Sequence, residues 1–159
     1  MYKVIFGTAL FAMLFSACKS KSAFNFSEDI VAKEKSLMAD IATTENKVEQ
    51  YAAAEQYDSV AIAAANMEGQ VQKKIDEIEA MSLPKANKAA EFKAAALRYF
   101  KYIKNRYTGY KSWGNATTEE ERASIFTDLQ KIDKEKEAAV DDMQMAQRKY
   151  AEANGLKME

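Results

Sequence analysis

The stretch Met81–Tyr110, MSLPKANKAAEFKAAALRYFKYIKNRYTGY, decides the fold, because it shows one helix ending and a long amphipathic helix beginning. Pro84 disfavours helix at Leu83 and fits the start of a following helix. We therefore expect a helix over residues 85–111, closed by Trp113-Gly114-Asn115. Its apolar residues recur at the steps of three and four that mark a helix buried on one face. They are Ala89, Phe92, Ala96, Phe100, Ile103, Tyr107 and Tyr110.

Two further apolar stripes with helical spacing lie upstream, over residues 30–51 and 60–78. Ser27 can cap the first helix and Asp58 the second. Neither Gly nor Pro separates the two stripes, but a single helix across both would be ~80 Å long at 1.5 Å per residue. Such a rod could not bury its own stripe in a small domain, so we expect a turn at residues 55–58. The expected helices cover residues 27–54 and 58–81.

The last helix is expected from Thr118 to Asn154. Thr117 and Thr118, followed by Glu119–Glu121, offer two overlapping capping boxes, and Asn154-Gly155 offers a C-terminal stop. Good helix formers dominate the chain, which holds one proline and five glycines. The pattern predicts an all-α fold, an antiparallel up-down-up-down four-helix bundle. The alternative is a three-helix bundle in which the first two helices are partly continuous.

The N-terminus shows a pattern typical of a secretory signal. Lys3 gives a basic start, an uncharged apolar run covers residues 4–15, and Ser16-Ala17 are the small residues expected at a cleavage site. The run is too short to span a bilayer, which needs about 20 apolar residues. We expect residues 1–17 to be a signal peptide that is removed. The remaining chain is long enough for one domain with its own core.

Cys18, the only cysteine, directly follows this signal. Phe15-Ser16-Ala17-Cys18 resembles the lipobox of bacterial lipoproteins, in which the cysteine thiol is acylated and its amine becomes the new N-terminus. The resemblance implies lipid attachment at Cys18 and a membrane partner reached through the acyl chains. The alternative is an ordinary cleaved signal, but a lone free thiol is a liability in an exported protein. The polar residues that follow predict a flexible tether over 18–26 and a bundle domain over 27–159.

Several classes of function are excluded by composition. The chain has no histidine, which removes Ser-His and Cys-His nucleophiles and most transition-metal sites. It also lacks a glycine-rich phosphate loop and a calcium-loop pattern. Without the signal, 22 bases face 24 acids, a formal charge of 22 − 24 = −2, which together with export argues against nucleic acid. We expect no enzymatic activity, no catalytic residue, no metal and no cofactor.

The helix expected over 85–111 is strongly basic. Between residues 88 and 111 seven bases face one acid (7 − 1 = +6), whereas residues 119–152 hold six bases and ten acids (6 − 10 = −4). We favour pairing of opposite charges along the flanks of neighbouring helices, as in coiled coils. The alternative is a basic strip that binds an anionic glycan, a lipid headgroup or an acidic partner. Its candidate residues are Arg98, Lys101 and Lys104.

Aromatic residues gather in the same helix. Tyr99, Tyr102 and Trp113 fall partly off the apolar stripe. Exposed tyrosines and tryptophans are common binding anchors, so these three complete the set of candidate binding residues. Packing in wide helix interfaces at one end of the bundle is the alternative, and we favour it.

From Asp29 to Glu159 the chain resembles a family of small helical bacterial surface lipoproteins of unknown function. The resemblance rests on Leu83-Pro84-Lys85, on Phe92–Leu97 with the aromatic residues after it, and on Tyr150–Leu156. It implies a fold and a location but no activity. Lys19 in place of Asp after the cysteine further implies the outer membrane, on its periplasmic or its surface side.

We therefore expect a non-enzymatic, lipid-anchored protein of the bacterial cell envelope. It would act through contacts with an envelope protein, a glycan or the envelope itself. The alternative is a carrier that binds an apolar or anionic small molecule or a glycan.

Overall fold

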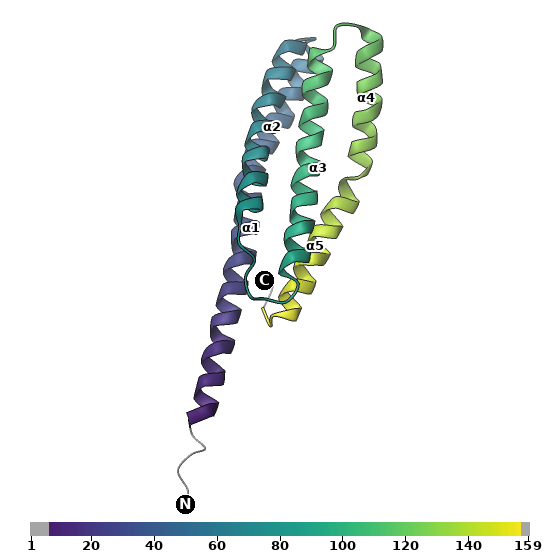
Figure 1. Cartoon of the computed structure of the whole chain (residues 1–159). Helices are drawn as coiled ribbons and strands as arrows, with labels where there is room; N and C mark the ends of the chain where they lie inside the picture. The colour runs from purple at the N-terminus through teal and green to yellow at the C-terminus, as the bar shows by residue number, and fades with distance from the viewer. Residues whose placement is uncertain (1–6, 157–159) are drawn as a thin grey trace, which may run out of the picture.

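The computed structural model describes the backbone of residues 7–156 and the side chains of residues 21–156. Over this range the chain forms helices and no strand. The helices are α1 (Gly7–Ala53), α2 (Tyr57–Ala80), α3 (Ala89–Asn115), α4 (Glu119–Lys134) and α5 (Lys136–Ala153). The bundle has four antiparallel segments, of which α1, α2 and α3 are the first three, and α4 and α5 together form the fourth (Figure 1). The expected up-down-up-down four-helix fold is confirmed, and the three-helix alternative is wrong.

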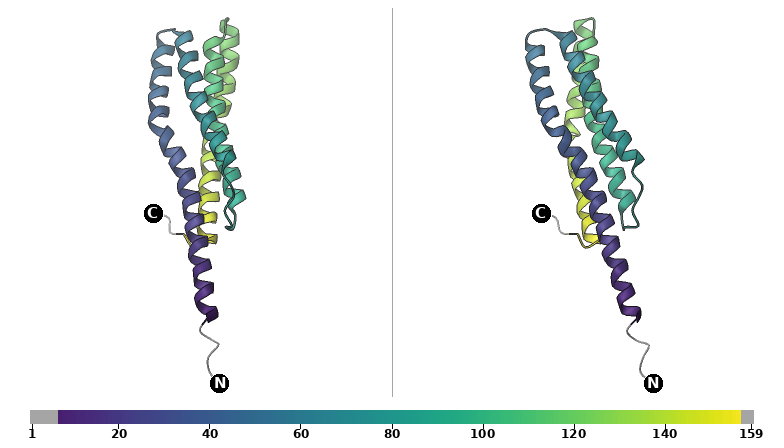
Figure 2. Two further views of the ribbon diagram at one scale, coloured as in Figure 1. Left: turned by 60° about the vertical axis from the view of Figure 1, so that its left-hand side comes forward. Right: turned by 90° about the vertical axis from the view of Figure 1, so that its left-hand side faces the viewer.

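The helices pack mainly against their neighbours in the chain. α2 packs on α1 and on α3, while α3 also packs on α4 near one end and on α5 near the other. Figure 2 shows that the loop between α2 and α3 and the C-terminal end of α5 lie at the end of the bundle from which α1 projects. We call this the anchor end. The α1–α2 and α3–α4 turns lie at the opposite end (Figure 2).

The turn between α1 and α2 forms without glycine or proline. Glu55 adopts the left-handed conformation, with φ 55°. The Gln56 N–H donates to the Tyr51 carbonyl at 2.8 Å and the Glu55 N–H donates to the Ala52 carbonyl at 3.1 Å, the pair of bonds that defines a Schellman motif. The turn therefore falls where the sequence predicts it.

α1 is helical and packed before its expected start at Ser27. Ala23 and Phe26 are buried, and Ser27 lies inside the helix rather than capping it. The spacing explains this, because Ala23, Phe26 and Ile30 extend the apolar stripe backwards in steps of three and four. The tether expected over 18–26 is correspondingly shorter, since the chain is packed from Ala23 onward.

Two other boundaries differ from expectation. α3 begins at Ala89, four residues later than expected, because Lys88 adopts a left-handed conformation with φ 60° and residues 81–88 form a loop. The fourth segment, expected to be one helix, is interrupted at Glu135. The apolar stripe lapses there: the residues between Ile132 and Ala139 are charged except for Ala138. With no buried side chain to hold it straight, this segment gains little from a continuous helix.

Candidate functional site

The three candidate bases do not share one surface. The Arg98 guanidinium lies 2.6 Å from Asp142 of α5, whereas the Lys101 ammonium lies 3.3 Å from Glu79 of α2, and both pairs are exposed. Lys104 is partly buried, and its charge lowers the pKa of Glu68 on α2. Their neighbours lie on two sides of α3, so the three bases do not form a continuous strip.

The remaining bases of α3 are also engaged by neighbouring helices. Lys111 pairs with Glu68 of α2, and Arg106 pairs with Glu45 of α1 and Asp133 of α4. Burial raises the pKa of Glu68, but hydrogen bonds from Lys111 and Thr108 outweigh it and hold that pKa below its usual value. The expected pairing of α3 with the acidic fourth segment is confirmed at Asp133 and Asp142, and α1 and α2 supply further acids.

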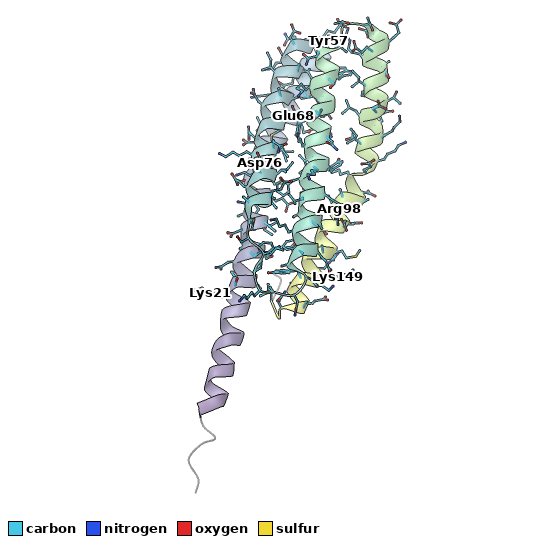
Figure 3. All side chains as sticks on the ribbon, in the orientation of Figure 1. Lys21, Tyr57, Glu68, Asp76, Arg98 and Lys149 are labelled. Atoms are coloured by element: carbon cyan, nitrogen blue, oxygen red, sulfur yellow. The ribbon has the colours of Figure 1, made fainter. Side chains whose placement is uncertain are left out.

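The three candidate aromatic residues are engaged in packing. Tyr99 is only 9% exposed and meets Phe100 edge-on at 5.7 Å between ring centroids. Trp113 is partly buried and meets Tyr57 edge-on at 5.2 Å, and Tyr57 lies at the end of the bundle opposite the anchor end (Figure 3). Tyr102 is partly buried, and its hydroxyl has no hydrogen-bond partner among residues 21–156. Packing accounts for most of the aromatic surface in this set.

A polar cluster that the sequence did not single out centres on Arg106. Its guanidinium lies 2.8 Å from Glu45 of α1 and 2.8 Å from Asp133 of α4, and it donates to the Tyr110 hydroxyl at 2.9 Å. The Tyr107 hydroxyl donates to the same Glu45 oxygen at 2.8 Å. One side chain of α3 thereby joins α1 to α4.

Burial and the neighbouring carboxylates shift the pKa values of Arg106 and Tyr107. Burial lowers the pKa of Arg106, but Tyr110, Glu45 and Asp133 outweigh it and raise that pKa overall. Burial raises the pKa of Tyr107, and the hydrogen bond to Glu45 acts in the same direction. A guanidinium fixed in its charged form and phenols fixed in their neutral form do not exchange protons near neutral pH. The cluster is therefore suited to fixing helix register rather than to acid–base chemistry.

The anchor end is held together by aromatic side chains from three helices. Phe26 of α1, Phe92 of α3 and Tyr150 of α5 meet with ring centroids 5.3 to 6.2 Å apart. The Tyr150 hydroxyl donates a buried hydrogen bond to the Ala23 carbonyl at 3.0 Å. The N-terminal part of α1 is therefore fixed to the C-terminal part of the chain.

A reciprocal asparagine pair ties the α2–α3 loop to the same end. The Asn154 side chain accepts from the Asn87 N–H at 3.0 Å and donates to the Asn87 carbonyl at 2.9 Å. Lys93 reaches back from α3 and donates to the Glu79 and Met81 carbonyls at 2.9 and 2.6 Å, which satisfies carbonyls at the end of α2. The loop is thus bonded at both of its ends.

Between this loop and α1 lies an open groove of about 700 Å³. Its walls mix polar and apolar side chains from the start of the packed part of α1 and from the loop. They are Lys21, Ser22, Asn25, Phe26 and Asp29 on one side and Met81, Ser82, Leu83 and Pro84 on the other. The groove opens at the anchor end, close to the residue expected to carry the lipid.

The side chain of Cys18, the expected lipid attachment residue, lies outside the described side chains, as do those of the expected signal peptide. Among the described residues no helix is both long and apolar enough to cross a bilayer. Within the same part of the chain no three acidic, cysteine or histidine side chains gather as they would around a metal ion.

Comparison with known proteins identifies no relative of this chain. The chain matches no family model, and no curated protein or solved structure is significantly similar to it.

Proposed function

We propose that this chain is a non-enzymatic, lipid-anchored protein of the bacterial cell envelope, held at the membrane through Cys18. The proposal rests first on the sequence, in which a signal-like run and a lipobox-like tetrapeptide precede the only cysteine. The structural support is that α1 is packed from Ala23 onward, which leaves little chain between the acylated residue and the bundle.

That short connection limits how far the bundle can stand from the lipid. Four residues, 19–22, lie between Cys18 and Ala23, so five residue steps join the two. They span about 8 Å as a helix and at most about 17 Å when fully extended. The anchor end is therefore held close to the membrane surface. Contacts with other envelope components would be made by the sides and the far end of the bundle.

The arrangement of α3 favours this role over a carrier that binds an anionic ligand along the helix. Such a carrier would need unpaired bases on one face. Arg98 and Lys101 instead pair with acids on different helices, and Arg106 and Lys111 are paired as well. Most of the positive charge of α3 is thus matched within the bundle.

Metabolic labelling with an alkyne fatty acid tests the anchor. We expect the labelled chain to be captured from cells that express the full sequence, and the label to be lost in Cys18→Ser. Ser20→Ala, two residues further on, is the matched control and should label normally. An unlabelled wild-type chain, or equal labelling of Cys18→Ser, would rule the anchor out.

A further inference from the structure

The anchor end carries exposed apolar side chains from two separate segments. Phe24 of α1 is 49% exposed and Leu83 of the α2–α3 loop is 51% exposed. The two segments lie side by side, because together they form the walls of the groove described above. Large apolar side chains exposed together at one end of a small domain are characteristic of an interaction surface.

Three exposed lysines lie at the same end of the bundle. Lys21 and Lys149 lie at this end in Figure 3, and Lys85 lies in the loop next to Leu83. Within the described residues none of the three forms an ion pair with an acid, in contrast to the bases of α3. Asp29 also lines the groove but lies about two helical turns further along α1 than Lys21. Flexible lysines beside apolar side chains match the layered chemistry of a bilayer interface.

We infer that the anchor end is a membrane-contact surface that docks on phospholipid, with Phe24 and Leu83 entering the interfacial region. Lys21, Lys85 and Lys149 would meet headgroup phosphates. The inference rests on the proposed acylation at Cys18, since the five residue steps to Ala23 bring this end within reach of the bilayer. A surface of this kind adds a protein contribution to the affinity that the acyl chains supply.

The segments that form the anchor end are fixed relative to one another, so the bundle would meet the membrane in a defined orientation. The aromatic cluster of Phe26, Phe92 and Tyr150 and the bond from Tyr150 to Ala23 fix α1 to α5, and the asparagine pair fixes the loop. Phe24 and Leu83 are therefore both held at this end, with Leu83 in the wall of the groove and Phe24 outside it. The bundle axis should stand away from the membrane, with Tyr57 at the far end (Figure 3).

A tryptophan reporter tests this inference on the full chain, purified in its acylated form. In a Trp113→Phe background, Leu83→Trp places a reporter at the surface, and Phe24→Trp is a second one on the other segment. Ile62→Trp is the matched control, because Ile62 is also exposed, at 64%, but lies on α2 about 27 Å along the helix axis from Ala80. All three variants replace exposed side chains, so folding should be preserved.

The proteins are bound to vesicles of phosphatidylethanolamine and phosphatidylglycerol in a 3:1 ratio, with and without brominated acyl chains. We expect the emission from positions 83 and 24 to shift to shorter wavelength and to fall at least twofold with brominated lipid. Emission from position 62 should not change. Intact mass measured on each sample establishes that the chain is acylated.

Three outcomes would overturn the inference, and they are distinguishable. Vesicle-bound, acylated protein with no quenching at positions 83 and 24 would leave the anchor in place but remove the contact surface. Equal quenching at position 62 would show that the bundle lies flat on the membrane. An unmodified Cys18 would remove the proposed function and with it the premise of this surface.

Discussion

Arg106 shows how much of this bundle depends on the chemistry of one side chain. Its planar guanidinium binds Glu45 and Asp133 and donates to the Tyr110 hydroxyl, so that α1, α3 and α4 meet at a single group. A lysine ammonium has the same charge and three donors, but it is one compact group at the end of a flexible chain and cannot meet partners on several sides as the planar guanidinium does. The residue therefore contributes through its shape as well as its charge.

We predict that Arg106→Lys lowers the free energy of unfolding by about 1 to 2 kcal/mol, because partly buried acceptors lose their partners. Arg98→Lys is the matched control, since the pair that Arg98 forms with Asp142 is exposed. That change should cost less than about 0.5 kcal/mol. Urea unfolding of both variants measures the difference, and equal losses would contradict the role assigned to Arg106.

Glu55 and Gly155 occupy equivalent positions in two helix C-termini. Both lie in the left-handed region, with φ 55° and φ 64°, and both ends show Schellman hydrogen bonds. Glycine tolerates this conformation, whereas a residue with a Cβ is strained in it. Glu55 is thus the less favourable residue at its position.

The two positions give opposite predictions. Glu55→Gly should raise the free energy of unfolding, and Gly155→Ala should lower it, each by about 1 kcal/mol. No heavy atom lies within 4 Å of a Cβ built at Gly155, so its cost would come from the backbone alone. Thermal or urea unfolding distinguishes the two signs, and a loss of stability in Glu55→Gly would refute the explanation.

Tyrosine side chains with raised pKa values make the folded state less stable at high pH. Burial raises the pKa of Tyr110 to about 12 and raises the pKa of Tyr99 and Tyr107 as well. Their neutral forms are favoured in the folded chain, so this stability is present below the unfolded pKa of about 10 and is lost as the pH rises above it.

We predict that the free energy of unfolding falls between pH 10 and pH 12, by up to about 1.4 kcal/mol per pH unit for each buried tyrosine. Tyr110→Phe should make this fall shallower, whatever it does to the stability at pH 7. Urea unfolding at several pH values, with phenolate absorbance followed in parallel, measures the slope. An unchanged slope in Tyr110→Phe would contradict the prediction.

At the scale of helices, two glycines control how closely α3 approaches its neighbours. A Cβ on Gly114 would lie 2.6 Å from the Tyr57 carbonyl oxygen and 2.6 Å from the Ala61 nitrogen, both backbone atoms of α2. A Cβ on Gly109 would lie 2.6 Å from the end of the Leu129 side chain of α4. Backbone atoms cannot move aside as a side chain can, so Gly114 is the stricter of the two.

We predict that Gly114→Ala destabilises the bundle by about 1 to 3 kcal/mol, the usual cost of overpacking. Gly69→Ala is the control, because Gly69 lies within α2 and has no atom within 4 Å of its Cβ position. There alanine should stabilise by about 0.5 to 1 kcal/mol through helix propensity. Destabilisation in both variants, or in neither, would contradict the assignment of a close contact at Gly114.

The helix ends that the sequence predicted well are those encoded by neighbouring residues. At the start of α4, Thr118 accepts from the Glu121 N–H at 3.1 Å, and the Glu121 carboxylate accepts from the Thr117 N–H at 2.9 Å. This reciprocal cap depends on a few adjacent side chains and is readable from the sequence. The break near Pro84 is of the same kind.

The features that the sequence did not predict depend on partners far along the chain. The spacing of Ala23, Phe26 and Ile30 allows α1 to begin before Ser27, but it does not show that Phe26 packs on Phe92 and Tyr150. Arg106 lies one position from the apolar stripe, and its role emerges only when Glu45 and Asp133 approach from other helices. For the candidate binding residues, the helix could be predicted from the sequence, but not which neighbouring helix each residue would face.

At the scale of the whole molecule, the two ends of the bundle differ in kind. The anchor end joins α1, the α2–α3 loop and the end of α5 through buried aromatic rings and reciprocal hydrogen bonds. It also carries the exposed side chains of Phe24 and Leu83. The far end has helix turns and the edge-on pair of Tyr57 and Trp113. The proposed attachment through Cys18 would use this difference, with the anchor end at the membrane and the far end available for contacts with other envelope components.

The central claim is that a lipid on Cys18 holds this bundle directly against the membrane. The measurement that tests it most directly is the mass of the N-terminal peptide of the protein purified from the membrane fraction. We predict a peptide that begins at Cys18 and carries the added mass of acyl groups on that cysteine. A peptide that retains residues 1–17, or one that begins at Cys18 with an unmodified thiol, would contradict the claim.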